Sequence, residues 1–440
     1  MKRDPGALQG REHDLLVIGG GIAGAWTAWE AASRGLKVAL VEIEDFGQAT
    51  SWSSLKTAHG GLRHLQRADL GGFRESVRER RTLLRVAPEV VRPLAFAIGA
   101  HGLVERVKYV LGGFANDVLS FDRNDGLRAD RAVGSSGLLG AAEARVLAGS
   151  AFDGVGAAFV WHDAQITHTE RLLIGLLHAA SDAEAAVINR VRLDACARDQ
   201  RGFALSATDL VTGRALRFRA RTIVNAAGMG LEPVARLLGE TCGAPKLIRG
   251  VNVVFGRDVT PGVAIGAKDR GKFLFVVPWL GQSMLGTIYD DGRSAVEPLV
   301  DELVAAGARA FPWAGLRRDE VTAVQAGHVP GVPDGSEPVY RSRLITHSDP
   351  RIVSVVTAKY TTARATAESA VNRIGEALRT VLRSSISDVT PLPQAVPLSG
   401  DVEHRIAVAM EGEMALTRND AVRGRLIEGA LGVHVLGGEA

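Results

Sequence analysis

The pattern of apolar residues near the start of the chain changes from that of a strand to that of a helix. Residues 14–18 are almost entirely apolar, as in a buried strand, and the glycine-rich turn 19–24 leads into the helical stretch 25–32. Residues 37–41 predict a second strand, which ends at Glu42. These elements follow one another in the order of a nucleotide-binding unit.

The turn carries the G-x-G-x-x-G spacing of a dinucleotide-binding loop. Gly19 permits the tight turn, Gly21 lets the backbone approach a pyrophosphate, and Gly24 lets the helix pack closely on the strand. The pyrophosphate is expected at the N-terminus of the helix, where free N–H groups and the helix dipole favour negative charge. Glu42, about 20 residues after the turn, is placed to accept hydrogen bonds from a ribose hydroxyl. A purely structural glycine loop is the alternative, and the order of the flanking elements favours nucleotide binding.

The rest of the pattern predicts a mixed α/β fold. Helices are expected at 73–87, 167–178 and 361–384. Strands are expected at 186–193, 203–208, 215–220, 251–255, 273–277 and 283–287. The second and third of these strands form a hairpin, and the last three alternate in polarity, as in an antiparallel sheet. Residues 94–160 are rich in glycine and are expected to be irregular.

Three segments that are far apart in the sequence indicate which dinucleotide is bound. Residues 49–65 follow the nucleotide-binding unit directly, and residues 220–228 form a strand that runs into a turn of small residues. Residues 352–362 form a strand that leads into a long helix. A site built from three distant segments suits an extended cofactor held across one domain, such as FAD. A nicotinamide cofactor must enter and leave the protein, so it needs a site built from fewer segments.

These segments resemble the FAD-dependent glycerol-3-phosphate dehydrogenase/oxidase family, which belongs to the larger group of D-amino-acid oxidase-like flavoproteins. The resemblance runs through residues 12–380 without large gaps in the motif regions. The motifs that carry it are ATSWSSLKTAHGGLRHLQ (49–66), RTIVNAAG (221–228), FLFVVPW (273–279), MLGT (284–287) and VSVVTAKYTTARATAE (353–368).

The resemblance implies an α/β fold with a Rossmann-type FAD-binding domain that is discontinuous in sequence. An antiparallel β-sheet substrate domain and a short C-terminal helical tail complete the expected chain. The FAD-binding domain is expected to comprise residues 12–93, 161–245 and 347–384. Residues 94–160 and 246–346 form the expected substrate domain, and residues 385–440 the linker and tail.

The resemblance also implies which residues surround the cofactor. Lys359 lies beside the strand-to-helix turn that is expected to cap the N1–C2=O edge of the flavin ring, where a cation or a helix N-terminus stabilises the anionic reduced flavin. Thr361 and Thr362 are expected to cap the helix and to offer hydroxyl and N–H groups to the ring. Besides the three glycines and Glu42, the expected FAD-binding residues are Thr50, Ser51, Ser54, Lys56, Val191, Ala227, Gly228, Lys359, Thr361 and Thr362.

Oxidation of a secondary alcohol needs a base for the hydroxyl proton and a cationic site for the rest of the substrate. Histidine suits the base because its pKa lies near working pH, and the family has a histidine at the position of His59. Arg63 is expected to hold the substrate anion, because a guanidinium matches a phosphate or carboxylate with paired donors. The resemblance also places Arg249 and Arg343 at the substrate end of the site. A core histidine and a surface arginine are the structural alternatives for His59 and Arg63.

The chain departs from the family at the substrate end. Where the family reads S-G-V-R-P-L, residues 326–331 read AGHVPG, so Val329 stands at the place of an expected arginine, beside His328. Loss of one buried arginine from an anion site weakens a charged contact by about 2–5 kcal/mol.

The resemblance implies an enzyme that oxidises glycerol 3-phosphate to dihydroxyacetone phosphate, or a related phosphorylated polyol, by hydride transfer to flavin N5. Two alternatives stay open. One is a related flavin oxidase or dehydrogenase with a changed substrate, a 2-hydroxy acid or an amino acid. The other is a non-catalytic flavin-binding protein.

Composition limits the classes of binding partner and the cellular location that are expected for this protein. The 440 residues include 52 basic and 49 acidic side chains, and the net charge of +3 is too small to indicate nucleic acid. Two cysteines, Cys196 and Cys242, lack the spacing of a disulfide framework or a metal site, so a cytoplasmic protein without metal is expected. No apolar stretch reaches the length of about 18 residues that spans a membrane. The family passes electrons to quinone or oxygen, and residues 423–436 form either a peripheral membrane contact or a frayed tail.

Overall fold

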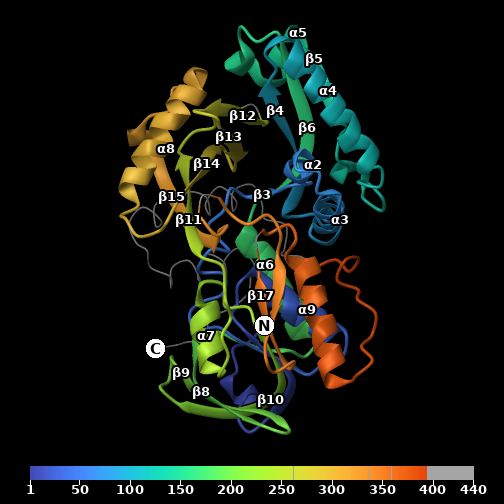
Figure 1. Ribbon diagram of the computed structural model, residues 1–440, viewed down its shortest axis with the longest axis vertical. Helices are drawn as coiled ribbons and strands as arrows, with labels where there is room; N and C mark the ends of the chain where they lie inside the picture. Colours follow the sequence, from blue (N-terminus) through green and yellow to red (C-terminus); the bar gives the residue numbers. More distant parts are fainter. Residues whose placement is uncertain (261, 336, 358, 394–440) are drawn as a thin grey trace.

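Two β-sheets lie one above the other along the long axis of the molecule (Figure 1). The computed structural model describes residues 1–393 with the exception of residues 261, 336 and 358. The lower sheet in Figure 1 contains the N-terminal nucleotide-binding unit, and the upper sheet is mostly antiparallel.

The lower sheet is built around the nucleotide-binding unit. Its strands, in spatial order, are β16 (Arg343–Thr346), β17 (Ile352–Val356), β10 (Ala215–Asn225), β1 (Glu12–Ile18), β2 (Val38–Val41) and β7 (Ala186–Ile188). The strands from β17 to β7 are parallel, whereas β16 is antiparallel to β17. The hairpin of β8 (Val191–Asp199) and β9 (Gly202–Asp209) pairs with the first half of β10.

Both faces of the lower sheet are covered, which explains the unbroken apolar run in β1. Leu15 and Val17 face a layer of α1 (Ile22–Ser33), α6 (Thr169–Asp182) and α9 (Ala363–Leu378). Leu16 and Ile18 face the opposite side, against residues of β8, β9 and β10. A strand buried on both faces needs apolar residues at every position rather than at alternate ones.

The upper sheet carries the predicted antiparallel strands. In spatial order its strands are β15 (Val321–Pro330), β11 (Leu247–Phe255), β14 (Gln282–Asp290), β13 (Lys272–Trp279), β12 (Ala264–Asp269), β4 (Val91–Gly99), β6 (Ala157–Ile166) and β3 (Thr57–Ala58), with β5 (Gly137–Gly140) on β6. The helices α8 (Glu297–Ala310), α4 (Gly102–Leu119) and α5 (Ala141–Ala148) pack on it, and α3 (Leu70–Val86) also contacts its strands β4 and β6. The other α-helices are α2 (Leu62–Gln66) and α7 (Leu231–Leu237). Short 3-10 helices occupy Pro5–Ala7, Ala129–Arg131, Gly149–Phe152, Gly228–Gly230, Pro312–Ala314 and Arg318–Glu320.

Most of the predicted elements are present, and the structure differs from the predictions at three places. Residues 94–160 are not irregular, because they include the long helix α4; its Gly113 is buried where a Cβ would lie 2.9 Å from the ring of Phe159. The single strand expected at 186–193 is two strands, β7 and β8, because Arg190 adopts a positive φ of 53° between them. The last helix, α9, ends early, at the left-handed Arg379.

The chain crosses between the two sheets several times, and the first crossing comes before β3, which already belongs to the upper sheet. The boundaries expected after residues 93 and 160 fall inside β4 and β6, and both of these strands belong to the upper sheet. β16 lies inside the expected substrate segment and pairs with β17 of the lower sheet. The first residues of the expected linker pack on the lower half, where the Leu392 N–H donates to the Val86 carbonyl at 2.8 Å. The rest of that linker and the expected tail lie outside the described residues.

Helix α3 holds the two halves together through two consecutive side chains. Glu79 accepts two hydrogen bonds from Arg364 of α9, at 2.7 and 2.8 Å, and both side chains are buried. Arg80 donates to Asp163 of β6 at 2.7 Å, also in the interior. We call these two pairs the α3 clamp. The clamp joins a helix of the lower half and a strand of the upper half to the same turn of α3.

Helix α4 presents an apolar face to solvent. The exposed side chains include Leu103, Val104, Leu111 and Phe114, which are 64–82% exposed, and Val107, Val110 and Val118 at about half exposure. They recur at helical spacing, so they form one continuous stripe. None of the helices within the described residues is both long enough and apolar enough to cross a membrane.

Gly24, in the first turn of α1, packs directly against the backbone of the glycine turn. A Cβ at this position would lie 1.8 Å from the carbonyl oxygen of Gly19, and neither backbone can yield. Gly24→Ala should therefore lower the free energy of unfolding by about 3 kcal/mol or more. Gly112→Ala in α4 is the matched control, because a Cβ there meets nothing within 4 Å, and it should stabilise by about 1 kcal/mol. Urea unfolding measures both; equal midpoints would show that the close approach is not needed.

The Asp163 carboxylate in the α3 clamp should make stability depend on pH. Burial alone would raise its pKa, but the bonds from His59, Arg80 and the Gly60 N–H lower the pKa to about 2. Asp163→Asn should cost about 3–5 kcal/mol at neutral pH, because Arg80 stays buried without its anion. The difference in the free energy of unfolding between wild type and Asp163→Asn should reach its full size above about pH 4, the pKa of an unfolded aspartate. It should shrink as the pH falls towards 2.

The matched control for Asp163→Asn is Asp122→Asn, which removes a more exposed carboxylate paired with Arg74 and Arg81 of the same helix. The control should cost about 1 kcal/mol. Urea unfolding of the three proteins at neutral pH and at about pH 3 provides the measurement. A difference between wild type and Asp163→Asn that is independent of pH would contradict the assigned ionisation.

Candidate functional site

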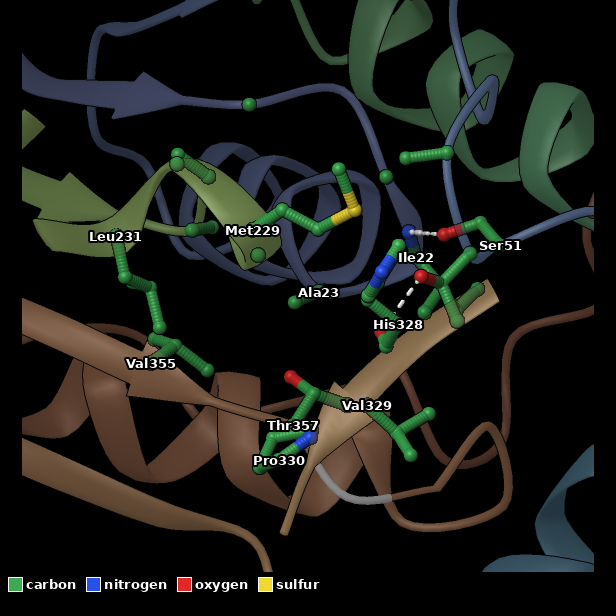
Figure 2. A pocket seen from close by; sticks show the side chains of 18 of the residues that line it. Ile22, Ala23, Ser51, Met229, Leu231, His328, Val329, Pro330, Val355 and Thr357 are labelled. Atoms are coloured by element: carbon green, nitrogen blue, oxygen red, sulfur yellow. Dashed lines mark hydrogen bonds between the residues drawn. The ribbon is translucent and has the colours of Figure 1, made fainter. Parts of the chain in front are cut away.

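A cavity of about 1270 Å³ runs between the two halves of the molecule. Its lining begins at the glycine turn after β1 and ends among polar side chains of the upper sheet, including His59 and Tyr289. Figure 2 shows residues of α1, β15 and β17 around the same open space. The cavity therefore joins the predicted nucleotide site to the predicted substrate site.

The glycine turn leaves room for a ligand at the N-terminus of α1. Gly19 has a φ of 107°, and a Cβ there would lie 2.7 Å from the carbonyl oxygen of Ala226. Gly21 is the N-cap residue of α1 and offers no side chain to the first N–H groups. Ser51 accepts a hydrogen bond from the Ile22 N–H at 3.0 Å (Figure 2). This combination of bare backbone and helix N-terminus fits a pyrophosphate.

Glu42 lies at the end of β2, beside this turn. Its carboxylate accepts hydrogen bonds from the Gly20 N–H at 2.6 Å and from the Glu44 N–H at 2.8 Å. Burial raises the pKa of Glu42, although these bonds act in the opposite direction. Val191, which lines the same end of the cavity, donates its N–H to the Glu42 carbonyl at 2.8 Å. The acid and the turn are thus fixed to one another, as binding of a ribose requires.

The predicted cofactor residues fall into two groups. Those that line the cavity are Gly19, Gly21, Glu42, Thr50, Ser51, Ser54, Val191, Ala227, Gly228, Lys359 and Thr361. Gly24, Thr362 and Lys56 do not line it. Gly24 serves the packing of α1, and Thr362 is the N-cap residue of α9, with its hydroxyl 3.4 Å from that of Ser342.

Lys56 is turned into the protein interior. Its ammonium donates to the Trp52 carbonyl at 2.6 Å and to the Thr169 hydroxyl at 2.7 Å, and it lies 3.3 Å from the Glu170 carboxylate. Its side chain is fully buried. In this position Lys56 ties the serine-rich segment to the start of α6.

His59 is held by a buried aspartate that the sequence analysis missed. Asp163 Oδ2 lies 3.1 Å from His59 Nδ1, and the side chain of His59 is 45% exposed where it borders the cavity. Asp163 Oδ1 accepts from the Gly60 N–H at 2.6 Å and from Arg80. His59 Nε2 lies 2.9 Å from the Thr57 hydroxyl. An aspartate on Nδ1 leaves Nε2 as a proton acceptor, as a histidine base needs, and the Thr57 hydroxyl is the partner of Nε2 in this structure.

Two cations, Arg63 and Lys359, come together near this end. Lys359 lines the cavity, and burial together with the charge of Arg63 lowers its pKa to about 8. Arg63 is exposed and donates to the Tyr340 hydroxyl at 3.3 Å. Burial raises the pKa of Tyr289, which also lines the cavity, while the charge of Arg63 lowers it. The charge of Arg63 therefore acts on two residues of the cavity lining, Lys359 and Tyr289, although Arg63 itself is not part of that lining.

The structure does not bring Arg249 and Arg343 to the cavity lining. Arg249 is buried, and its guanidinium forms a bidentate pair with Asp290 and donates to the carbonyls of Ser294 and Ala295. Arg343 is exposed at the start of β16. Val329 does line the cavity, together with His328, whose carbonyl accepts from the Thr50 hydroxyl at 2.7 Å (Figure 2).

Three residues of this end were missed by sequence reasoning: Asp163, Tyr289 and His64, which contacts Lys359. Asp163 carried a signal, because it is the one acidic residue in the otherwise mostly apolar strand β6. His64 and Tyr289 carried none, since pairing across the molecule decides what they face.

Comparison with known proteins bears on the family and the cofactor. Residues 14–372 match the family described as DAO, FAD dependent oxidoreductase. A glycerol-3-phosphate dehydrogenase of Synechocystis sp. is 31% identical over 432 residues, which cover 89% of this chain and 75% of that protein. A probable mitochondrial glycerol-3-phosphate dehydrogenase of Caenorhabditis elegans is 28% identical, with 85% of this chain and 56% of that protein covered. An aerobic glycerol-3-phosphate dehydrogenase of Staphylococcus haemolyticus is also 28% identical, with 76% of this chain and 62% of that protein covered, so this chain spans less than two thirds of the last two relatives.

Solved structures share the fold. The glycerol-3-phosphate dehydrogenase of Bacillus halodurans, solved with FAD, has a TM-score of 0.66 at 22% identity and covers 96% of this chain and 76% of its own. The L-α-glycerophosphate oxidase of Mycoplasma pneumoniae, also with FAD bound, has a TM-score of 0.64 at 17% identity, with 87% of this chain and 99% of its own covered. These similarities confirm the predicted fold class. A glycine turn that accommodates a pyrophosphate, an acid fixed beside it and a family match over most of the chain lead to one conclusion: the chain belongs to the FAD-dependent oxidoreductase (DAO) family, and its cofactor is FAD.

Proposed function

We propose that this enzyme oxidises the secondary alcohol of glycerol 3-phosphate, or of a closely related phosphorylated polyol, and that its electron acceptor is a quinone or oxygen. The observation that carries the proposal is an aspartate–histidine pair at one end of the cofactor cavity, together with Lys359 in the cavity lining and Arg63, whose charge acts on Lys359. The relatives named glycerol-3-phosphate dehydrogenase support this choice of substrate.

His59 is the group that takes the proton of the substrate hydroxyl. The Asp163 carboxylate assigns the ring proton to Nδ1 and leaves Nε2 as the acceptor. The Thr57 hydroxyl, 2.9 Å from Nε2, holds this acceptor until a substrate hydroxyl replaces it. Once His59 is protonated, Asp163 stabilises the imidazolium. FAD, when bound, supplies the ring nitrogen that accepts the hydride from the carbinol carbon.

Arg63 and Lys359 hold the phosphate of the substrate. The guanidinium of Arg63 offers paired donors that match phosphate oxygens. Burial and the charge of Arg63 hold the pKa of Lys359 at about 8, so Lys359 is mostly charged at neutral pH and loses its charge above it. Arg249 is excluded from this anion site because Asp290 already takes its guanidinium. Arg63 is preferred to Arg343 because the charge of Arg63 acts on Lys359 and Tyr289, two residues of the cavity lining.

A flavin oxidase or dehydrogenase with a changed substrate is the second candidate, and Val329 is the observation that favours it. This apolar residue lines the cavity where the resemblance leads one to expect an arginine. A 2-hydroxy acid or an amino acid presents a carboxylate, whose single charge needs fewer cations than a phosphate does. Titration of the flavin with both kinds of substrate separates the two candidates.

We also propose that the enzyme contacts a membrane surface peripherally, as a quinone acceptor would require. The apolar stripe of α4 supports this, since an exposed helical face of leucine, valine and phenylalanine suits the boundary between headgroups and acyl chains. The segment 423–436, which the sequence also suggested for this contact, lies outside the described residues.

Substitution of His59 and Arg63 should separate proton transfer from anion binding. His59→Ala should lower the rate of flavin reduction by glycerol 3-phosphate about 10²–10⁴-fold, because the base is lost. Arg63→Ala should raise the apparent Michaelis constant about thirtyfold, since a charged contact of about 2 kcal/mol is removed. Anaerobic stopped-flow measurement of the flavin band against substrate concentration gives both constants.

The matched control for Arg63→Ala is Arg78→Ala, which removes an exposed arginine of α3 outside the cavity lining and should change neither constant. Each variant should retain FAD. If glycerol 3-phosphate fails to bleach the wild-type flavin while a 2-hydroxy acid or an amino acid does, the proposed substrate is wrong.

Acidic substitutions on α4 should weaken binding to membranes. Leu111→Glu combined with Phe114→Glu should reduce co-sedimentation of the full chain with anionic phospholipid vesicles at least tenfold, because two apolar side chains worth about 1.5–3 kcal/mol each no longer enter the lipid. Val146→Glu, at an 89% exposed site on α5, is the control and should leave binding unchanged. Equal sedimentation of all three proteins would exclude α4 as the contact.

A further inference from the structure

A hydrogen-bond chain leads from Lys359 away from the cavity. Lys359 Nζ lies 2.7 Å from His64 Nε2, and His64 Nδ1 lies 2.8 Å from Asp69 Oδ2. Only 2% of His64 is exposed, so its imidazole depends on protein partners. The reaction derived above uses neither His64 nor Asp69.

The order of donors along this chain follows from the charges at its two ends. Asp69 is an acceptor, so the proton of His64 lies on Nδ1 and Nε2 is left as an acceptor. Lys359, as an ammonium, donates to that nitrogen and keeps two further N–H groups for other partners. Burial and the charge of Lys359 lower the pKa of His64, which favours the neutral imidazole that this arrangement needs.

Asp69 is itself firmly placed. It is the N-cap residue of α3 and accepts a hydrogen bond from the Gly72 N–H at 3.1 Å. It also pairs with the guanidinium of Arg341, whose Nε lies 2.8 Å from Oδ2. The pairing with Arg341 and these hydrogen bonds hold the pKa of Asp69 below its usual range, so it is an anion at every pH of interest.

We propose that His64 and Asp69 are positioning residues that hold Lys359 as an ammonium at the substrate end of the cavity. His64 supplies the acceptor that fixes the ammonium, and Asp69 supplies both the tautomer of His64 and a negative charge. This inference rests on the proposed function only in the identity of the anion that Lys359 binds. The hydrogen bonds that link Lys359, His64 and Asp69 do not depend on that identity.

Other charged groups also act on this chain, and they come from several elements. Arg63 of α2 disfavours the ammonium of Lys359, whereas Glu75 of α3 and Asp163 of β6 favour it. The ring of Tyr340 lies 5.9 Å from the Lys359 ammonium, and Arg341 disfavours a charged His64. None of these groups replaces the acceptor that His64 offers at 2.7 Å.

The experiment measures the protonation of Lys359 directly. The FAD-loaded full chain, without substrate, is labelled with acetic anhydride at a series of pH values, and acetylation of Lys359 is quantified by peptide mass spectrometry. His64→Leu removes the acceptor and Asp69→Asn removes the charge, so both should lower the pKa of Lys359. A fall of about half a unit would raise the reactive fraction at neutral pH about threefold.

Two further variants separate positioning from general stability. His64→Gln keeps an oxygen that can accept from Lys359, and it should keep the wild-type labelling curve. Asp122→Asn removes a carboxylate that pairs with Arg74 and Arg81 of α3 and lies outside the cavity lining, and it should also leave the curve unchanged. The flavin absorbance of each variant confirms folding.

Wild-type labelling curves in both His64→Leu and Asp69→Asn would overturn the proposal, because Lys359 would then be held without the chain. A change in His64→Leu that His64→Gln shares equally would also overturn it. Labelling needs no substrate, so failure of glycerol 3-phosphate to reduce the flavin would refute the proposed function and leave this result standing.

Discussion

The α3 clamp is the interaction on which the rest of the site depends. Consecutive residues of one helix reach in different directions, Glu79 to Arg364 in the lower half and Arg80 to Asp163 in the upper half. Arg364 lies in the first turn of α9, a few residues after Lys359, and Asp163 holds His59. A buried ion pair is costly to break once formed, because either partner alone would be a charge without compensation. The clamp therefore keeps His59 and Lys359 facing the same cavity.

Burial of charge also decides which groups are free to act. Lys56 and Arg249 are both buried and already have partners inside the protein, the first with Thr169 and Glu170, the second with Asp290. Lys359 is buried as well, but its partner is a neutral imidazole, which leaves it cationic and able to bind an anion. The charge available to a substrate thus follows from the pairing of cations within the fold rather than from their number in the sequence.

The cofactor end and the substrate end follow different physical rules. At the cofactor end, binding depends mainly on the backbone: a glycine turn, a helix N-terminus and an acid that is hydrogen-bonded to the turn. At the substrate end the side chains decide, so one change such as Val329 can alter what is bound.

The sequence by itself determined the elements whose pattern is local. The glycine turn, the strands β1 and β2, the helix α3 and the upper-sheet strands β11, β13 and β14 follow from spacing and polarity over a few residues. The position of His59 at the cavity also followed from its motif. Tertiary structure alone decided the partners: that Asp163 meets His59, that His64 meets Lys359, and that Asp290 removes Arg249 from the cavity. These pairs join residues 41–295 positions apart, and no local pattern encodes a contact that forms only when two sheets and a clamping helix are packed together.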